Sequence, residues 1–455
     1  MEFFINNDTK LNIGQFLGFG TSGFLCKNST NEIIMTKYIG QWLALTPLQN
    51  SLDRIKSGIG VSYYKNGNIE YKGNWKSNMR DGFGIAYYQN GNKKYIGSWK
   101  YDSYNDWGAQ YNSFGMKIYQ GFHQDGEMNN LGECYDLAKG VLKYMGQLKQ
   151  GNKHGIGQSF SGLLNKEYEG FWSKTKTKFG ILYHENGLKK YEGDFENGFE
   201  HGKGTSYYES GNVKYKGEYR YGKMNGEGIN FFDQEHLVIE HQGEFLEGQR
   251  YYKGISYYEN GNALYNGDWL YDKMNGFGTS FFENGQKKYE GQLIDGVREG
   301  HGLAYTTNGQ LIYNGEWLNG LKHGEGTSYY DNESCSVKFD GEWQYGRFNG
   351  YGIFMREDGE IDYQGEWENG LYHGNGEKHY GNRVRYQGQF VENEKSGIGK
   401  LIYPKNVVVY KGNWLGDKRN GLGEKFDGLG KLVVNANWVG DHIVQVVFTK
   451  EQAEV

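Results

Sequence analysis

The sequence at residues 313–330 is Tyr-Asn-Gly-Glu-Trp-Leu-Asn-Gly-Leu-Lys-His-Gly-Glu-Gly-Thr-Ser-Tyr-Tyr. Side chains alternate between the two faces of a β-strand, so Tyr313, Gly315 and Trp317 share one face. Glycine is unfavourable inside a strand unless another group must approach it closely. We therefore predict that rings of one strand lie over glycines of the next. In particular, we expect the Trp317 ring to need the space that Gly326 leaves open.

This phrase recurs along nearly the whole chain, in steps of 23 to 26 residues and most often 24. A fixed period of this length is the signature of a repeat architecture. Its first residue falls at Tyr71, Tyr95, Tyr119, Tyr144, Tyr168, Tyr191, Tyr215, His241, Tyr265, Tyr289, Tyr313, Phe339, Tyr363, Tyr386 and Tyr410, and a sixteenth copy begins at Val434.

The spacing and residues of these copies resemble the MORN repeat family. The resemblance covers roughly residues 58–440, which we take as the repeat array. It implies an all-β fold, an elongated single-layer antiparallel sheet of tandem β-hairpins. Residues 1–57 would form an irregular N-terminal cap, and residues 441–455 a C-terminal cap and tail. The resemblance also implies scaffolding, often at the cytoskeleton, cilia or membranes.

Composition supports one long array over several globular domains. Glycine contributes 73 of 455 residues, about 16%, and the usual share is about 7%. Tyrosine is abundant with 40 residues, and proline occurs only twice. This mixture suits many short strands joined by tight turns. A disordered chain would instead be poor in aromatic residues.

Charge and cysteine content narrow the classes of partner and compartment. The net charge is −5, and no basic run of the kind that binds nucleic acid is present. Cys26, Cys134 and Cys335 are far apart and form no CxxC pair, so we expect neither a disulfide framework nor a metal site. The first ten residues are too polar for a signal peptide. No apolar stretch approaches the ~20 residues that span a bilayer, so we expect a soluble, cytoplasmic protein.

The N-terminal cap allows two interpretations. Gly18, Gly20 and Gly23 have GxGxxG spacing and Lys37 follows them, which resembles the glycine-rich loop region of a protein kinase. The catalytic loop and the metal-binding Asp-Phe-Gly of that family do not follow, so phosphoryl transfer is not expected. In the second interpretation, residues 38–42 open a degenerate repeat. Both interpretations stay open on the sequence alone.

Local signals predict one helix and two kinds of turn. Leu48, Leu52 and Ile55 have helical spacing, which predicts a short helix over Leu43–Lys56. Asn-Gly pairs such as Asn66-Gly67 suit type I′ hairpins. A second turn follows each tryptophan, and we expect a left-handed residue just before its Gly-x-Gly. The residues at that position are Asp81, His154, His201, Asn225, Asn275, His323, Asn349, His373 and Asn420.

The array is least regular between Tyr101 and Phe179. Asp106 replaces the first glycine of one Gly-x-Gly, and Phe179 stands where a glycine is expected. A bend, a partner site and simple drift are three alternatives for this region.

The sequence contains no catalytic constellation, and we expect neither an enzyme nor a cofactor. The periodic histidines alternate with asparagine and aspartate at one position, which favours a turn role over metal ligation. The aromatic residues of the phrase are the candidate structural residues and a candidate binding face. They include Tyr71, Trp75, Tyr95, Trp99, Tyr265, Trp269, Tyr313, Trp317, Trp343, Tyr363, Trp367, Tyr410 and Trp414.

Two functions compete. The first is a scaffold that offers an extended β-ribbon to protein partners of a larger assembly, with self-association as an option. It would act in the cytoplasm, at the cytoskeleton, the cilium or its axoneme. The alternative is a peripheral module that binds membrane phosphoinositides. The acidic charge balance argues against it, because such binding gains about 1 kcal/mol per basic residue near the surface. We therefore expect only weak lipid contact and no nucleic-acid binding.

Overall fold

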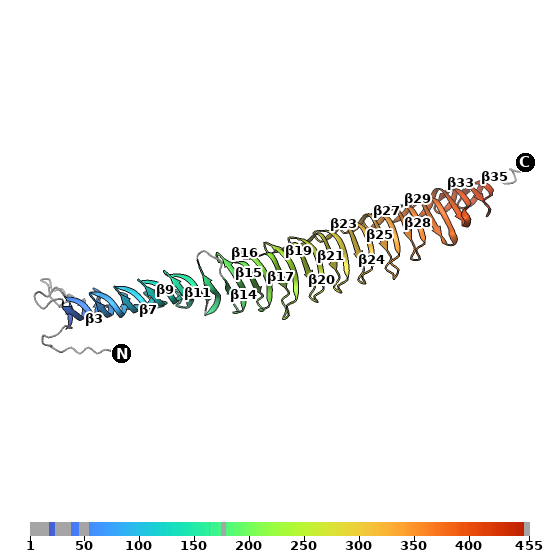
Figure 1. Cartoon of the computed structure of the whole chain (residues 1–455). Coiled ribbons are helices and arrows are strands. Elements are labelled where there is room, and N and C mark those ends of the chain that lie inside the picture. Colours follow the sequence, from blue (N-terminus) through green and yellow to red (C-terminus); the bar gives the residue numbers. More distant parts are fainter. Residues whose placement is uncertain (1–17, 23–37, 45–53, 163, 174–178, 450–455) are drawn as a thin grey trace. The chain divides into compact units, whose positions relative to one another are not determined.

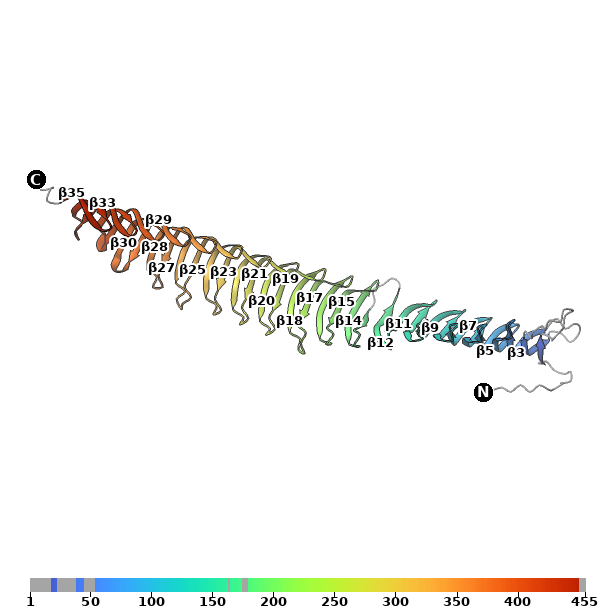
Figure 2. The same cartoon turned by 180° about the vertical axis from the view of Figure 1, so that it is seen from behind.

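The computed structural model describes residues 18–22, 38–44, 54–162, 164–173 and 179–449. It forms two compact units, one of residues 1–214 and 219–222, the other of residues 215–218 and 223–455. Within each unit, strands that are consecutive in the chain pair antiparallel, as β3 does with β4 and β24 with β25. Figure 1 shows the strands following one another in chain order, and Figure 2 shows them from behind. The predicted all-β fold of tandem hairpins is confirmed.

The described strands of the first unit are β1 (Gly18–Ser22), β2 (Tyr38–Ala44), β3 (Arg54–Tyr63), β4 (Ile69–Lys76), β5 (Met79–Tyr87), β6 (Lys93–Lys100), β7 (Ser103–Tyr111), β8 (Lys117–Gln124), β9 (Glu127–Tyr135), β10 (Leu142–Lys149), β11 (Asn152–Ser161), β12 (Asn165–Trp172), β13 (Gly180–Tyr183), β14 (Lys189–Glu196) and β15 (Phe199–Tyr207). Strand β16 (Val213–Arg220) contributes residues to both units.

The second unit continues with β17 (Lys223–Phe231), β18 (Ile239–Leu246), β19 (Gln249–Tyr257), β20 (Ala263–Leu270), β21 (Lys273–Phe281), β22 (Lys287–Ile294), β23 (Val297–Tyr305), β24 (Leu311–Leu318), β25 (Leu321–Tyr329), β26 (Val337–Gln344), β27 (Arg347–Met355), β28 (Ile361–Glu368), β29 (Leu371–Tyr380), β30 (Val384–Val391), β31 (Glu394–Tyr403), β32 (Val407–Leu415), β33 (Lys418–Phe426), β34 (Leu432–Val439) and β35 (His442–Thr449). Two short 3₁₀ turns, η1 (Gly381–Arg383) and η2 (Pro404–Asn406), link three of these strands.

Glycines face one another across the strands and seat a tyrosine ring. Gly315 of β24 pairs with Gly326 of β25. A Cβ atom added to Gly326 would lie 2.3 Å from the Tyr313 hydroxyl oxygen, so the tyrosine ring covers this glycine pair. The Tyr313 hydroxyl then donates a hydrogen bond to the Glu316 carbonyl at 3.0 Å. The ring that needs Gly326 is therefore that of Tyr313, and the prediction that assigned this space to Trp317 was wrong.

The Trp317 ring instead packs against the preceding strand, β23. It pairs with Gly300, and its indole N–H donates to the Gly302 carbonyl at 3.1 Å. Its ring meets those of Tyr289 and Tyr313 edge-on, with centroids 5.7 Å and 5.0 Å away. The predicted contact of this ring with a glycine of an adjacent strand is confirmed by this hydrogen bond, but the space above Gly302 is occupied by the Tyr289 ring. Each tryptophan of this kind joins its own repeat to the one before it.

The type I′ turn lies after the tryptophan, not at the Asn-Gly pair. Asn319 and Gly320 both have positive φ, 51° and 78°, as a type I′ turn requires. The predicted left-handed residue before each Gly-x-Gly was also wrong. At all nine positions the positive φ falls on the next residue, a glycine, as at Gly324 after His323. Glycine adopts this conformation without steric penalty, which leaves the histidine or asparagine in an ordinary strand conformation.

The Asn-Gly turn has a different geometry because the asparagine makes bonds of its own. Gly67 N–H donates to the Tyr64 carbonyl, and only Gly67 of the Asn-Gly pair has positive φ. This is a type I turn followed by a bulged glycine. The Asn66 amide accepts a bond from the Asn68 N–H and donates one to the Gln89 carbonyl of the next repeat. The asparagine thus joins successive repeats along this edge.

At the N-terminal end, the described backbone has the register of a regular repeat. Gly18 pairs with Trp42 and Gly20 with Gly40. Gly324 and Gly326 make the same pairs with the tryptophan and glycine of β26. Thr21 and Ser22 also match the Thr-Ser that follows Gly326. Gly18 and Gly20 therefore occupy repeat positions, whereas Gly23 and Lys37 lie outside the described residues.

The predicted helix over Leu43–Lys56 is wrong at both ends. Residues 43 and 44 belong to β2 and residues 54–56 to β3, and residues 45–53 lie outside the described residues. At the other end of the chain, β35 pairs with β34 over residues 442–449.

His241 replaces the tyrosine of its repeat and should make that repeat sensitive to acid. It is fully buried, and its Nδ1 lies 2.8 Å from the Ser256 hydroxyl. Burial, followed by repulsion from Arg250, lowers its pKa to about 4. The unfolded chain takes up the proton near pH 6.5, so stability falls as the pH drops from there towards 4. We expect a loss of roughly 3 kcal/mol in this repeat by pH 4.

Hydrogen exchange at residues 239–270, corrected for intrinsic rates, measures this loss. His241→Tyr places the residue of the neighbouring Tyr215 and Tyr265 at the same position and should remove the pH dependence. Equal acid sensitivity in both proteins would assign the effect to other groups.

Candidate binding surfaces

The thirteen aromatic residues singled out in the sequence all lie in the interior of one face, which we call the aromatic face. Their exposed fractions range from 0% at Tyr71 and Tyr313 to 8% at Trp75. The rings pack on glycines and on one another, so they stabilise the fold and leave little surface for a ligand. The described residues that contact a partner must therefore be sought above these rings or on the opposite face.

A row of side chains covers the rings on the aromatic face. Each member lies opposite the tryptophan position of its own hairpin, as Lys322 does to Trp317. We call this the covering row. Its described members are Lys56, Arg80, Tyr104, Met128, Lys153, Glu200, Met224, Arg250, Met274, Arg298, Lys322, Phe348, Tyr372, Lys395, Arg419 and Ile443.

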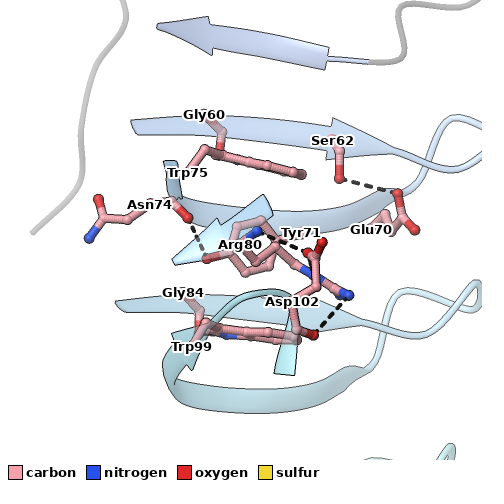
Figure 3. Close-up of polar contacts among 10 residues, drawn as sticks. All are labelled: Gly60, Ser62, Glu70, Tyr71, Asn74, Trp75, Arg80, Gly84, Trp99 and Asp102. Atoms are coloured by element: carbon pink, nitrogen blue, oxygen red, sulfur yellow. Dashed lines mark hydrogen bonds and ion pairs between the residues drawn. The ribbon is translucent and has the colours of Figure 1, made fainter. Parts of the chain in front are cut away.

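Cations of the covering row stack on rings of two successive repeats. Figure 3 shows Arg80 between Tyr71 and Trp99, and its guanidinium carbon lies 5.8 Å and 4.2 Å from their ring centroids. Its Nε donates to the Asp102 carboxylate at 2.8 Å. Such cation–π contacts contribute about 0.5–1 kcal/mol at exposed sites and more when desolvated. The covering row therefore adds a second connection between repeats.

The opposite face of the first unit carries an exposed apolar stripe. Its members are the middle residues of Gly-x-Gly in six successive repeats. Their exposed fractions lie between 48% for Trp107 and 62% for Ile156. Contiguous exposed apolar surface is typical of interaction sites. The members of this apolar stripe are Ile59, Phe83, Trp107, Leu131, Ile156 and Phe179.

The stripe ends where charged residues replace the apolar ones. The next three repeats place Lys203, Glu227 and Lys253 at the same position, and all three are exposed. Phe179 belongs to the stripe because Gly180 beside it pairs with Gly170 of β12. The prediction that Phe179 takes a glycine position was therefore wrong. The sequence between Tyr101 and Phe179 departs from the repeat in its glycines but keeps an apolar residue at this position.

Other candidate sites are not found in the described part of the chain. There, no group of three His, Cys, Asp or Glu side chains lies close enough to hold a metal ion. Likewise, the described residues contain no helix long and apolar enough to cross a membrane. Cys134 and Cys335 are unpaired thiols.

Neither the covering row nor the apolar stripe was identified from the sequence. The signal was present in both cases, because each set occupies one fixed position of the repeat. Aligning the copies on Gly-x-Gly would have separated Ile59 and Phe83 from Lys203 and Glu227. Aligning them on the tryptophan would have shown the covering row in the same way.

Comparison with known proteins identifies the repeats. The profile of the MORN repeat matches eleven segments: residues 71–93, 144–159, 191–213, 215–229, 265–287, 289–310, 313–335, 339–361, 363–385, 386–408 and 410–428. The copies that begin at Tyr95, Tyr119, Tyr168 and His241 fall outside these segments but form the same hairpins.

Searches for whole-chain relatives add little. No curated protein matches the sequence. A solved structure described as "Crystal Structure of TcdB2-TccC3-TEV" is similar at 10% identity over 90% of this chain, with a TM-score of 0.15. This chain spans 22% of that chain, and so low a TM-score supports no conclusion. The repeat profile, by contrast, matches about half of the sequence, and its segments begin at tyrosine or phenylalanine positions of the phrase. The chain belongs to the MORN repeat family.

Proposed function

We propose that this protein is a non-enzymatic scaffold that binds protein partners, acting in the cytoplasm at the cytoskeleton or the cilium. MORN repeats occur in proteins that bind proteins or membranes, and such folds are typically non-enzymatic. The apolar stripe of the first unit supports the protein-binding alternative most strongly. Six exposed apolar side chains at one repeat position offer a partner a regular series of apolar contacts.

The arrangement of the stripe suits a scaffold. Equivalent residues of successive repeats are two strands apart, or about 10 Å, because adjacent strands are ~4.8 Å apart. A rigid series of hairpins can therefore present many weak contacts at fixed spacing. Loss of one contact lowers affinity, whereas a change of several prevents assembly.

A charge-substituted stripe tests this proposal in the organism's own cells. Phe83→Lys with Leu131→Lys places at these positions the residue found at Lys203 and Lys253. We expect the tagged variant to fold normally, to leave its cellular structure and to lose its co-purified partner at least tenfold. Phe277→Lys is the control, since Phe277 is at least as exposed as Phe83 and Leu131 but lies outside the stripe.

Unchanged location and partner binding in the stripe variant would contradict the proposal. Vesicle flotation distinguishes a membrane-binding stripe from a protein-binding one. If the wild-type chain floats with phosphoinositide vesicles and the stripe variant does not, the stripe is a membrane surface.

A further inference from the structure

Four cations of the covering row have a carboxylate supplied by the next repeat. The carboxylate belongs to the second residue of the following type I′ turn, 22 residues further along the chain. It accepts from the cation, and it also accepts the backbone N–H of the same residue at 2.9 to 3.0 Å. The side-chain pairs are Arg80–Asp102 at 2.8 Å, Arg250–Asp272 at 3.0 Å, Lys395–Asp417 at 3.5 Å and Arg419–Asp441 at 2.8 Å.

The identity of this turn residue correlates with the charge of the covering-row residue. Lys56 is matched by Asn78, whose side-chain oxygen accepts the Lys56 N–H at 2.7 Å. Uncharged members are mostly followed by glycine, which offers no side chain to accept such a bond. Examples are Tyr104 with Gly126, Met128 with Gly151, Met224 with Gly248, Met274 with Gly296 and Phe348 with Gly370. A cation in the covering row therefore normally has an acid or amide in the next turn.

Arg298 and Lys322, in consecutive repeats, break this pattern. The turn residues that should accept from them are Gly320 and Gly346. Lys322 instead lies over the rings of Tyr313 and Trp343, with its Nζ 4.7 Å and 4.6 Å from their centroids. Within the described part of the chain, no carboxylate lies within ion-pair distance of either cation. Burial, and then repulsion from Lys338 and Arg298, lowers the pKa of Lys322 to about 8.

Lys322 lines a pocket of about 410 Å³ whose wall contains several hydrogen-bond donors. Lys338 and Arg347 also line this pocket. Ser328 lines it too, is only 4% exposed, and its hydroxyl has no hydrogen-bond partner. In the equivalent positions of an earlier repeat, the Ser256 hydroxyl lies 2.8 Å from His241 Nδ1 and accepts from Arg250 at 3.4 Å. Asp272 accepts from the Nε of the same arginine. The pocket thus has a cation, Lys322, and a serine, Ser328, at these positions, with Gly346 in place of the aspartate.

We propose that this pocket binds a carboxylate side chain of an acidic segment in a partner protein. The incoming carboxylate pairs with Lys322 as Asp272 pairs with Arg250, and it also accepts from the Ser328 hydroxyl. A carboxylate is favoured over a phosphate because four other repeats of this chain fill the equivalent position with aspartate. This inference rests on the proposed scaffold function and names the chemistry of a second contact, on the aromatic face.

Gly346→Asp restores the missing acid and should close the site. Gly346 has φ 80°, close to the 65° to 75° of Asp102, Asp272 and Asp441, and a Cβ atom there meets nothing within 4 Å. The probe is a fluorescein-labelled hexa-aspartate peptide, followed by fluorescence polarisation with the full chain at low salt. We expect the wild type to bind it and Gly346→Asp to bind at least tenfold more weakly.

Two further variants distinguish binding at this pocket from a general effect of charge on the chain. Lys322→Met, with the residue of Met274 at this position, should also weaken binding about tenfold while the chain folds normally. Gly248→Asp adds the same charge at the turn residue that is matched to Met224, an uncharged member of the covering row, and should leave peptide binding unchanged. Its Gly248 also has positive φ and free space around a Cβ atom.

Equal peptide binding by the wild type and Gly346→Asp would overturn the proposal. So would an absence of peptide binding combined with Gly346→Asp-sensitive binding of inorganic phosphate or phosphoinositide vesicles, which would make this a phosphate site. A failure here would leave the stripe experiment standing, because the stripe variant changes only Phe83 and Leu131 of the first unit. Loss of the partner in the stripe variant would then support the scaffold without this pocket.

Discussion

Replacing Gly326 with valine is expected to destabilise its repeat by about 3 kcal/mol or more, since overpacking and displaced backbone both contribute. The added Cβ atom would lie 2.3 Å from the Tyr313 hydroxyl and 2.6 Å from the ring carbon that carries it. The tyrosine cannot move aside easily, because it is fully buried. The backbones also approach closely here, since a Cβ atom on Gly315 would lie 2.4 Å from the Cα atom of Gly326.

Glu325→Val is the matched control for this change. It introduces the same side chain one residue earlier, on the exposed opposite face, where Ile398 and Leu422 stand in other repeats. We expect an effect within about 0.5 kcal/mol, as for most surface substitutions. Urea denaturation of both variants measures the difference. Similar midpoints for the two valine variants would show that no ring occupies the space above Gly326.

Replacing Trp317 with alanine is expected to cost about 3–5 kcal/mol, the usual loss for a buried tryptophan. The variant loses the indole bond to the Gly302 carbonyl and the edge contacts with Tyr289 and Tyr313. It also removes the ring on which Arg298 stacks at 4.6 Å.

A leucine at the same position should cost less. Leu293 and Leu148 fill this position in other repeats and are buried there. Trp317→Leu therefore keeps part of the apolar contact and loses the hydrogen bond. Denaturation that ranks leucine below alanine in stability would contradict the packing described for this ring.

The strands and their faces could be predicted because the repeat phrase states them many times. A single Tyr-x-Gly-x-Trp is a weak signal, but copies at a 24-residue period fix both the strand positions and the buried face. The glycine pairs added the requirement for a close approach. What one phrase could not show was which strand supplies each ring, since Tyr313 and Trp317 lie on the same face but pack towards opposite neighbours.

The turn types were predicted wrongly because they depend on hydrogen bonds between repeats. Asn-Gly is a strong signal for a type I′ turn when the hairpin is considered alone. Here the Asn66 side chain bonds to its own turn and to the Gln89 carbonyl one repeat further on. This ladder favours a type I turn with a bulged glycine. The kinase-like spacing of Gly18 and Gly20 has a different explanation. Both glycines occupy repeat positions, and Gly-x-Gly-Thr-Ser also occurs at residues 324–328.

The candidate surfaces depend on side chains that the repeat leaves free to vary. Ile59, Phe83 and Trp107 form a stripe only when repeats are compared at one position. Lys322 becomes unusual only beside Gly346, which lies in the next repeat. Such relations follow from the structure, since they require knowing which turn lies against which strand.

Each repeat is stabilised by its immediate neighbours through the packing of rings and glycines. Amide hydrogen exchange along the whole chain of the Trp317→Ala variant, compared with the wild type, tests this claim most directly. In a linear array, stability is a sum of repeat and nearest-neighbour terms. We therefore expect protection to fall between residues 289 and 363, and to stay at the wild-type level in residues 54–162 and 407–439. Uniform loss of protection across the chain would contradict this, as it would reveal a single cooperative core. No loss at any position would place the Trp317 ring outside the interior.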